Sequence, residues 1–244
     1  MARKLSNADI TRLKERKIAP VKSRTAVFAT AKAMSLTLQG NPNWVATAQW
    51  TNDTGSPISS FEASWVVPPP PTAPDRNQII FLFIGIGNAS FILQPILVWQ
   101  SIDNPANANW FVAGMISTGQ NAPATINGQQ QVASGTTIKG IITLESSDGS
   151  GFVYSCQLDQ YPATLTQTDP MPELKQVFVV LESYRINKNR TYYPPIDATT
   201  IMNPLISTRA GIAAPTWQMA PPGPLGEFAA LGNQGNGPDI TLNY

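Results

Sequence analysis

The chain has 244 residues, of which 42% are hydrophobic and only 13% are charged, and its formal net charge at pH 7 is +1. It contains no histidine and one cysteine, Cys156, which excludes an internal disulfide, Ser-His or Cys-His catalysis, and a zinc site built from histidine and cysteine. Any chemistry must therefore use carboxylates, amides, hydroxyls or lysines.

The charge is unevenly distributed along the chain. Residues 1–40 hold nine basic and two acidic side chains, or +7, whereas the remaining 204 residues sum to −6. We interpret residues 1–40 as a basic arm and residues 41–244 as the folded domain. The arm is either a solvated leader or an inhibitory pro-segment that packs on the acidic body. Nucleic-acid binding is not expected, because the body carries no basic stripe.

We expect no Sec-type signal peptide in the arm, since its Thr25–Leu36 stretch, which would have to serve as the apolar region, is interrupted by Thr, Lys and Ser. No run approaches the roughly 18 uninterrupted apolar residues of a membrane span, so we expect no membrane partner. Within the arm, Ser6–Lys17 predicts a short helix with Ser6 as its N-cap, ended by Pro20.

The folded domain is divided into short apolar segments by turn residues, with 22 Pro and 17 Gly in the chain, which is typical of an all-β domain. The predicted strands are, in chain order, Trp44–Thr51, Phe61–Val67, Ile79–Ile86, Phe91–Trp99, Asn109–Ser117, Thr137–Glu145, Gly151–Leu158 and Glu173–Tyr184. Gln129–Gln131 predicts a loop or an edge strand, and Asp239–Tyr244 a last edge strand.

Two polar residues lie within otherwise apolar strands. Alternation of side chains puts Gln94 on the same face as Ile92, Ile96 and Val98. The same rule puts Glu182 on the face of Phe178, Val180 and Tyr184, at the end of a buried run where a carboxylate is poorly solvated. A buried amide needs hydrogen-bond partners, so Gln94 either pairs with nearby backbone or water or has a functional role.

Three motifs in order, SWVVPPP (Ser64–Pro70), FIGIGN (Phe83–Asn88) and ILQPILVW (Ile92–Trp99), resemble those of the glutamic peptidases, the eqolisins of peptidase family G1. The later segment VFVVLESY (Val177–Tyr184) is similar to the strand that carries the family's catalytic glutamate, and Asn43-Trp44 is similar to its early N-W. The resemblance covers about residues 43–184.

The resemblance implies one antiparallel β-sandwich of jelly-roll or concanavalin-like type, with a groove for an extended peptide. It also implies an acid-acting endopeptidase without metal or cofactor, secreted like the family and otherwise cytoplasmic. Gln94 and Glu182 match the catalytic pair: the Glu182 carboxylate would activate water and the Gln94 amide would donate to the oxyanion. On that basis we expect the two side chains on adjacent strands, sharing a water. Trp44 and Phe83 are candidate substrate-binding residues in the groove.

The sequence departs from the family pattern near this pair. Phe83 replaces a tryptophan, Gly87 and Val98 replace aspartates, and Val112 stands where an acidic residue is usual. Loss of these neighbours favours an alternative function, a sandwich that binds peptides or glycans without catalysis. Retention of Gln94 and Glu182 favours the peptidase, which binds a polypeptide substrate and, as a further partner, its own N-terminal arm.

Overall fold

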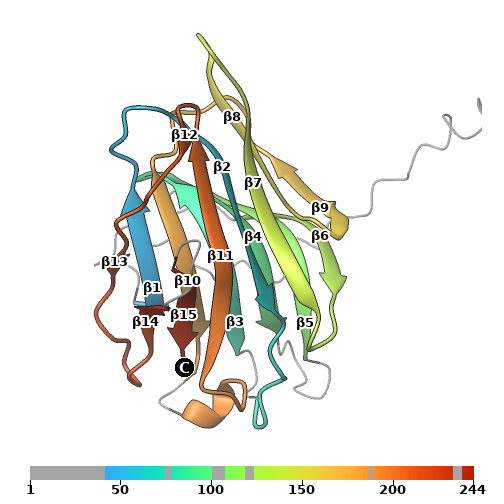
Figure 1. Ribbon diagram of the computed structural model, residues 1–244. Coiled ribbons are helices and arrows are strands. Elements are labelled where there is room, and N and C mark those ends of the chain that lie inside the picture. Colours follow the sequence, from blue (N-terminus) through green and yellow to red (C-terminus); the bar gives the residue numbers. More distant parts are fainter. Residues whose placement is uncertain (1–41, 75–77, 101–107, 119–123, 187–188, 233–237) are drawn as a thin grey trace, which may run out of the picture. The chain divides into compact units, whose positions relative to one another are not determined.

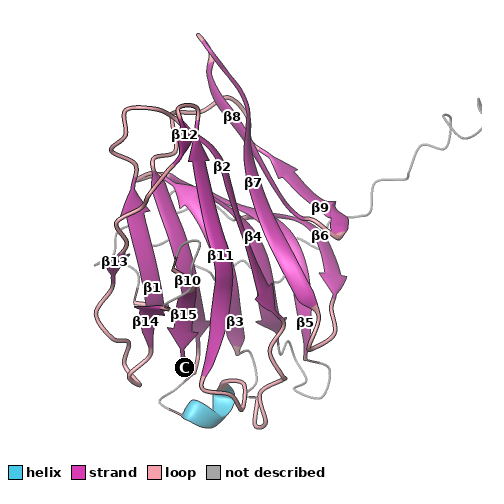
Figure 2. Cartoon of the chain, in the orientation of Figure 1, coloured by secondary structure: helices cyan, strands magenta, loops and turns pink. Residues whose placement is uncertain are grey.

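The computed structural model describes residues 42–74, 78–100, 108–118, 124–186, 189–232 and 238–244. Two antiparallel sheets form separate layers in this part of the chain, and its single helix is the three-residue 3-10 turn η2 (Arg190–Tyr192) (Figures 1 and 2). The prediction of an all-β antiparallel sandwich is confirmed. The predicted helix Ser6–Lys17 and the arm lie outside the described residues.

The first sheet has seven strands in the order β13-β1-β10-β3-β4-β5-β6. In chain order they are β1 (Trp44–Thr51), β3 (Ile79–Gly87), β4 (Phe91–Gln100), β5 (Asn109–Thr118), β6 (Thr125–Gln131), β10 (Gln176–Tyr184) and β13 (Gln218–Met219). The predicted central pair, β3 and β4, is an antiparallel hairpin whose turn is closed by Asn88, since its Oδ1 accepts from the backbone N–H of Ser90 and Phe91. Gln129–Gln131 belongs to the edge strand β6.

The second sheet has eight strands in the order β14-β15-β11-β2-β7-β8-β9, with the short β12 paired to β11. In chain order they are β2 (Ile58–Val66), β7 (Thr137–Asp148), β8 (Gly151–Leu158), β9 (Tyr161–Gln167), β11 (Ala198–Thr208), β12 (Gly211–Ile212), β14 (Phe228–Leu231) and β15 (Ile240–Asn243). Figure 1 shows β11, β2 and β7 side by side in front of the first sheet.

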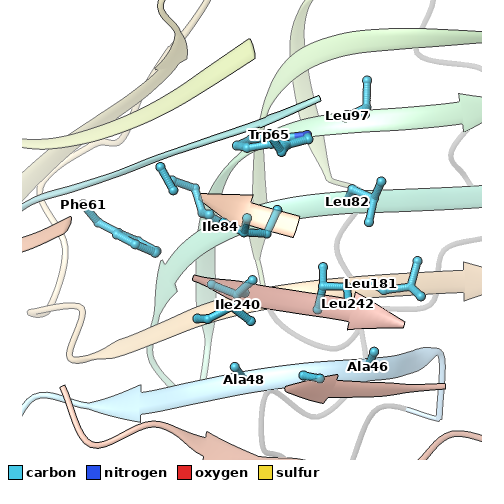
Figure 3. Packing of buried hydrophobic residues seen from close by; sticks show 14 of the residues in the cluster. Ala46, Ala48, Phe61, Trp65, Leu82, Ile84, Leu97, Leu181, Ile240 and Leu242 are labelled. Carbon is cyan, nitrogen blue, oxygen red and sulfur yellow. The ribbon is translucent and has the colours of Figure 1, made fainter. Parts of the chain in front are cut away.

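One face of each sheet contributes to a single hydrophobic core. Ala46, Ala48, Leu82, Ile84, Leu97 and Leu181 enter it from the seven-stranded sheet, and Phe61, Trp65, Ile240 and Leu242 from the eight-stranded sheet (Figure 3). Trp65 and Phe61 are completely buried. Burial of such side chains stabilises the fold by about 1.5–3 kcal/mol each. The core therefore fixes which side of every strand faces inward.

One prediction from the C-terminal part of the sequence needs correction. Asp239–Tyr244 is not an edge strand, because β15 pairs with both β14 and β11. The 11-residue strand β11 contains Pro204, which lacks the N–H of a regular ladder. The sheet accommodates the proline through an irregular register with β2 between Met202 and Leu205 and a positive φ of 51° at Asn203.

Candidate functional site

The seven-stranded sheet has a second apolar face, which points away from the core and is here called the outer face. Its central side chains are all at most 3% exposed: Phe81, Phe83, Ile92, Gln94, Ile96, Val98, Phe178 and Val180. None of them belongs to the core cluster. Strand alternation therefore gives this sheet two buried faces, as the apolar sequences of β3 and β4 indicate.

Gln94 lies in the middle of β4, on the outer face as predicted. It is 2% exposed, pairs in register with Met115 of β5, and its Oε1 atom has no hydrogen-bond partner. The register of β3 with β4 puts Gly85 opposite Gln94 on the other side. The amide therefore stands beside a position that has no side chain.

Glu182 lies near the end of β10, also on the outer face, and is 7% exposed. Its register partners are Trp44 on β1 and Phe81 on β3. The Tyr184 hydroxyl donates to Glu182 Oε1 at 2.5 Å, and the Asn43 side chain bonds Tyr184 in turn. Burial, followed by the Glu182 charge, raises the pKa of Tyr184 above its ordinary value, so this hydroxyl keeps its proton.

The predicted pair shares a face, but the prediction of adjacent strands is wrong because β3 lies between β10 and β4. The register also places Phe178, not Glu182, in the row of Gly85 and Gln94. Glu182 is four residues farther along β10, about 13 Å along the strand and about 10 Å across two strand spacings, hence roughly 16 Å from Gln94 between Cα atoms.

This separation has a chemical consequence. Side chains in a sheet stand roughly perpendicular to it, so their ends remain far apart. A shared water spans only two hydrogen bonds of about 2.8 Å each. One water molecule therefore cannot join the Gln94 amide to the Glu182 carboxylate in this arrangement.

The two predicted groove residues, Trp44 and Phe83, also lie on the outer face. Trp44 is half-buried, and its ring meets those of Phe83 and Phe178 edge-on, with centroids 6.0 and 5.1 Å away. Phe83 is completely buried. The three rings form an aromatic cluster that extends from Trp44 in the Glu182 row to Phe178 in the Gln94 row, and such edge-on contacts stabilise it.

Two residues to which the sequence assigned no role, Tyr184 and Gln49, complete this region. Tyr184 follows Glu182 by two positions, so strand alternation alone predicts that both side chains share a face. Gln49 on β1 is 6% exposed with an unpartnered Oε1, and it pairs in register with Phe178. No sequence signal reveals this row, because it depends on which strands are neighbours.

The described residues contain no group of three or more His, Cys, Asp or Glu side chains placed to hold a metal ion. The described part of the chain also has no helix of sufficient length and hydrophobicity to cross a membrane.

Comparison with known proteins shows likeness at the level of the fold. No family model matches the sequence, and no curated protein matches it. Two solved structures of scytalido-glutamic peptidase, bound to transition-state analogues of which one is peptide-based, are similar with TM-scores of 0.52 and 0.53 and 11% identity. They cover 82% and 83% of this chain and 97% and 98% of their own chains.

A third similar structure is SCP-B, a member of the eqolisin family of peptidases, in a complex with the tripeptide Ala-Ile-His. Its TM-score is 0.50 at 11% identity, covering 82% of this chain and 96% of its own. At this identity the likeness shows a shared fold. The similar structures therefore agree with the β-sandwich fold that the sequence motifs predict.

Proposed function

We propose that the protein is an acid-acting endopeptidase in which Glu182 is the carboxylate that activates water. The observation that carries the proposal is Glu182. It is a buried carboxylate at the end of an apolar strand, and the Tyr184 hydroxyl donates a hydrogen bond to it. The domain that holds it is similar in fold to solved glutamic peptidases. The peptide-based ligands of the similar structures also support a polypeptide substrate.

The proposed reaction needs no covalent intermediate. The Glu182 carboxylate takes a proton from water, and the water oxygen forms a bond with the carbonyl carbon of the substrate. The protonated carboxyl then gives its proton to the amide nitrogen as the C–N bond breaks. Tyr184 and Asn43 act as positioning residues, because their chain of hydrogen bonds orients the carboxylate. Trp44, beside Glu182 in register, is the proposed aromatic contact of the substrate.

The distance between Gln94 and Glu182 changes the role that we assign to Gln94. An oxyanion donor must lie within about 3 Å of the oxygen that becomes negative, next to the attacking water. The register puts Gln94 too far from Glu182 for that. Gln94 therefore enters the proposal as a substrate-binding residue.

A second candidate function, peptide binding without catalysis, is favoured by the same separation. Catalysis in this fold could require two residues that share one water molecule. In that case a sheet that holds Gln94 and Glu182 too far apart for a shared water would bind a peptide without hydrolysing it. Incubation of the purified protein with a denatured, carboxymethylated protein substrate from pH 2 to 7 decides between them. New peptide fragments in wild-type samples that are absent from Glu182→Gln samples support the peptidase, and no fragments at any pH support binding alone.

A further inference from the structure

Glu227 is a deeply buried carboxylate that the proposed reaction does not use. It lies between β13 and the end of the chain, directly before β14, and is 1% exposed. Burial of a carboxylate is unfavourable unless hydrogen bonds replace the water that it loses. The groups that donate to Glu227 therefore indicate which parts of the chain it holds together.

In the part of the chain that the structure describes, two groups donate to the Glu227 carboxylate. The Tyr193 hydroxyl donates to Oε1 at 2.8 Å, and the backbone N–H of Leu225 donates to Oε2 at 2.8 Å. Burial raises the pKa of Tyr193 above its ordinary value, and the Glu227 charge raises it further, so this hydroxyl keeps its proton. Glu227 thereby joins Tyr193, which follows η2, to the turn of residues 223–227.

Tyr193 also reaches β10 from the core side. Its hydroxyl lies 3.0 Å from Ser183 Oγ, within hydrogen-bond distance, and both residues are buried. Ser183 is the residue between Glu182 and Tyr184, and strand alternation turns its side chain to the opposite face. The Tyr193 hydroxyl therefore anchors the backbone position that separates the proposed base from its hydrogen-bond donor.

The turn that carries Glu227 packs against β1 as well. It closes on itself, since the Gly223 N–H donates to the Glu227 carbonyl at 2.7 Å. A Cβ atom at Gly223 would lie 2.7 Å from Val45 O, so the turn has no room for a side chain there. Val45 follows Trp44, the register partner of Glu182, at an irregularity in the pairing of β1 with β10. The turn thus contacts β1 beside Glu182 and, through the tyrosine, β10 itself.

Further hydrogen bonds continue this link to the outer face. The Ser183 N–H donates to the Asn43 carbonyl at 2.8 Å, and the Asn43 side chain bonds the Tyr184 hydroxyl, which donates to Glu182. A buried polar network holds its members in one arrangement when they are paired. Glu182 and Glu227, one on each side of β10, therefore belong to a single hydrogen-bonded network.

We propose that Glu227 is a positioning residue for Glu182, because it fixes, through Tyr193, the Ser183 backbone between Glu182 and Tyr184. The inference rests on the proposed function, since it assigns the carboxylate that orients the water-activating one. Loss of the anchor would change the geometry of the Tyr184–Glu182 hydrogen bond and slow the chemical step. A purely stabilising cluster would instead lower the melting temperature and leave turnover unchanged below it.

One measurement observes the Tyr184 hydroxyl directly and needs no catalysis. Tyrosine labelled with carbon-13 at Cζ gives one NMR signal for each of the six tyrosines, and Tyr184→Phe identifies the signal of Tyr184. Glu182→Gln shows how this signal moves when the carboxylate acceptor is lost. We expect Tyr193→Phe, Ser183→Ala and Glu227→Gln to move it in the same direction, because each removes a link between Glu227 and β10.

The other measurement is steady-state kinetics on a fluorogenic octapeptide. Tyr193→Phe and Ser183→Ala should lower kcat about tenfold and leave KM within about twofold of wild type. The matched control is Thr199→Val, which removes a buried hydrogen bond to the Tyr244 hydroxyl, in the ring stacked on Tyr193. It should leave the Tyr184 signal and both kinetic constants unchanged. Ser183→Ala keeps both donors of the buried carboxylate, so it replaces Tyr193→Phe if circular dichroism shows that variant unfolded.

The two proposals fail separately. An unmoved Tyr184 signal in the folded variants, or an equal movement in Thr199→Val, would overturn the positioning role. Movement as expected, without fragments from the wild-type protein at any pH, contradicts the peptidase and supports the positioning of Glu182. Wild-type hydrolysis whose kcat is unaffected by Tyr193→Phe and Ser183→Ala contradicts the positioning role and supports the peptidase.

Discussion

Phe178 and Gln94 occupy one row of the seven-stranded sheet, separated only by Gly85. The position on β10 that faces the Gln94 amide across β3 is thus aromatic, and the carboxylate of Glu182 lies four residues away. A water-activating base and an amide that binds the substrate can work at such a separation, whereas a pair that shares one water cannot. This relationship leads to a kinetic prediction.

Substitutions of Glu182 and Gln94 should affect different kinetic constants, turnover for Glu182 and KM for Gln94. Glu182→Gln keeps the size of the side chain but removes the base, so turnover should fall to background while the affinity for peptide persists. Gln94→Ala should raise KM about tenfold and leave turnover within about twofold of wild type, because it removes binding that is equal in ground and transition states. Steady-state kinetics on a fluorogenic octapeptide measures both. A loss of turnover by about two to three orders of magnitude in Gln94→Ala, typical of a removed oxyanion donor, would instead restore Gln94 to the catalytic pair.

Gly85 should tolerate a small side chain in the folded protein but not in the ligand-bound state. The Cβ of Gly85→Ala would lie 3.3 Å from Ile92 Cγ2, a tight contact that a small shift of this side chain relieves. We therefore expect the free energy of unfolding to fall by about 1 kcal/mol, and peptide affinity to fall because Gly85 lies beside Gln94. Gly128→Ala is the contrast, because Gly128 has φ of +61° and its Cβ would collide with the Ala163 backbone. That variant should lose more than about 2 kcal/mol in urea unfolding. Similar losses of stability in the two variants would show that Gly85 tolerates a side chain no better than Gly128 does.

How much of this site could be predicted from the sequence depends on the kind of information that each part needs. Alternation along β4 and β10 places Gln94 and Glu182 on their correct faces, because period two is a local property of a strand. The neighbours of a strand are not local: β10 pairs with β1, more than 100 positions earlier, and with β3. The motifs therefore located the outer face, whereas the row that joins Gln49 to Gln94 required the sheet order.

The strands of the fold show the same difference between local and non-local information. The bounds of β1 and β8 agree with the predicted strands, since turn residues flank each of them. The sequence predicted no strand with definite bounds over Ala198–Thr208. Pro204 lacks the N–H of a regular ladder, and only the bulge opposite β2 makes it compatible with a central position.

A buried polar cluster beside the C-terminus should contribute to stability. The Tyr193 hydroxyl donates to Glu227 Oε1 at 2.8 Å and lies within hydrogen-bond distance of Ser183 Oγ, at 3.0 Å, and Glu227 is 1% exposed. Tyr193→Phe leaves this carboxylate with one partner fewer, so we expect a loss of about 1–3 kcal/mol in urea unfolding. The control is Tyr161→Phe, since the Tyr161 hydroxyl makes no hydrogen bond to the described residues. Equal stability of the two variants would argue against a structural role for the cluster.

Alkaline solution should destabilise the protein through its buried thiol and buried tyrosines, of which Cys156 and Tyr154 are examples. Burial raises the pKa of the Cys156 thiol from 9.0 to about 12 and that of Tyr154 from 10.0 to about 12. In the unfolded chain these groups lose their protons at lower pH than in the folded chain, so the unfolded state binds fewer protons as the pH rises from 9 to 12. Their stabilising effect is complete below about pH 9 and is lost toward pH 12. The melting temperature should fall by several degrees between pH 8 and pH 11, more so in wild type than in Cys156→Ser, and an unchanged melting temperature would contradict this.

The basic arm, residues 1–40, provides a prediction that is independent of the site. If it is a pro-segment, incubation at pH 3–4 should shorten the chain near the start of β1, and intact-mass spectrometry would detect the loss. Glu182→Gln protein, treated in parallel, should keep its full mass if the cleavage is the protein's own. An intact N-terminus after hours at pH 3–4 in a sample that digests other substrates would refute the pro-segment.

The position of β15 has a consequence for how the chain completes its fold. Among the described strands, β14 pairs with β15 alone, and β15 joins it to β11. β14 can therefore join the sheet only after β15 has paired with β11. Until then Ala229, which is 6% exposed in the folded protein, lacks its cover. A substitution that prevents Ile240–Asn243 from pairing would detach β14 as well and leave the edge of β11 open to other chains.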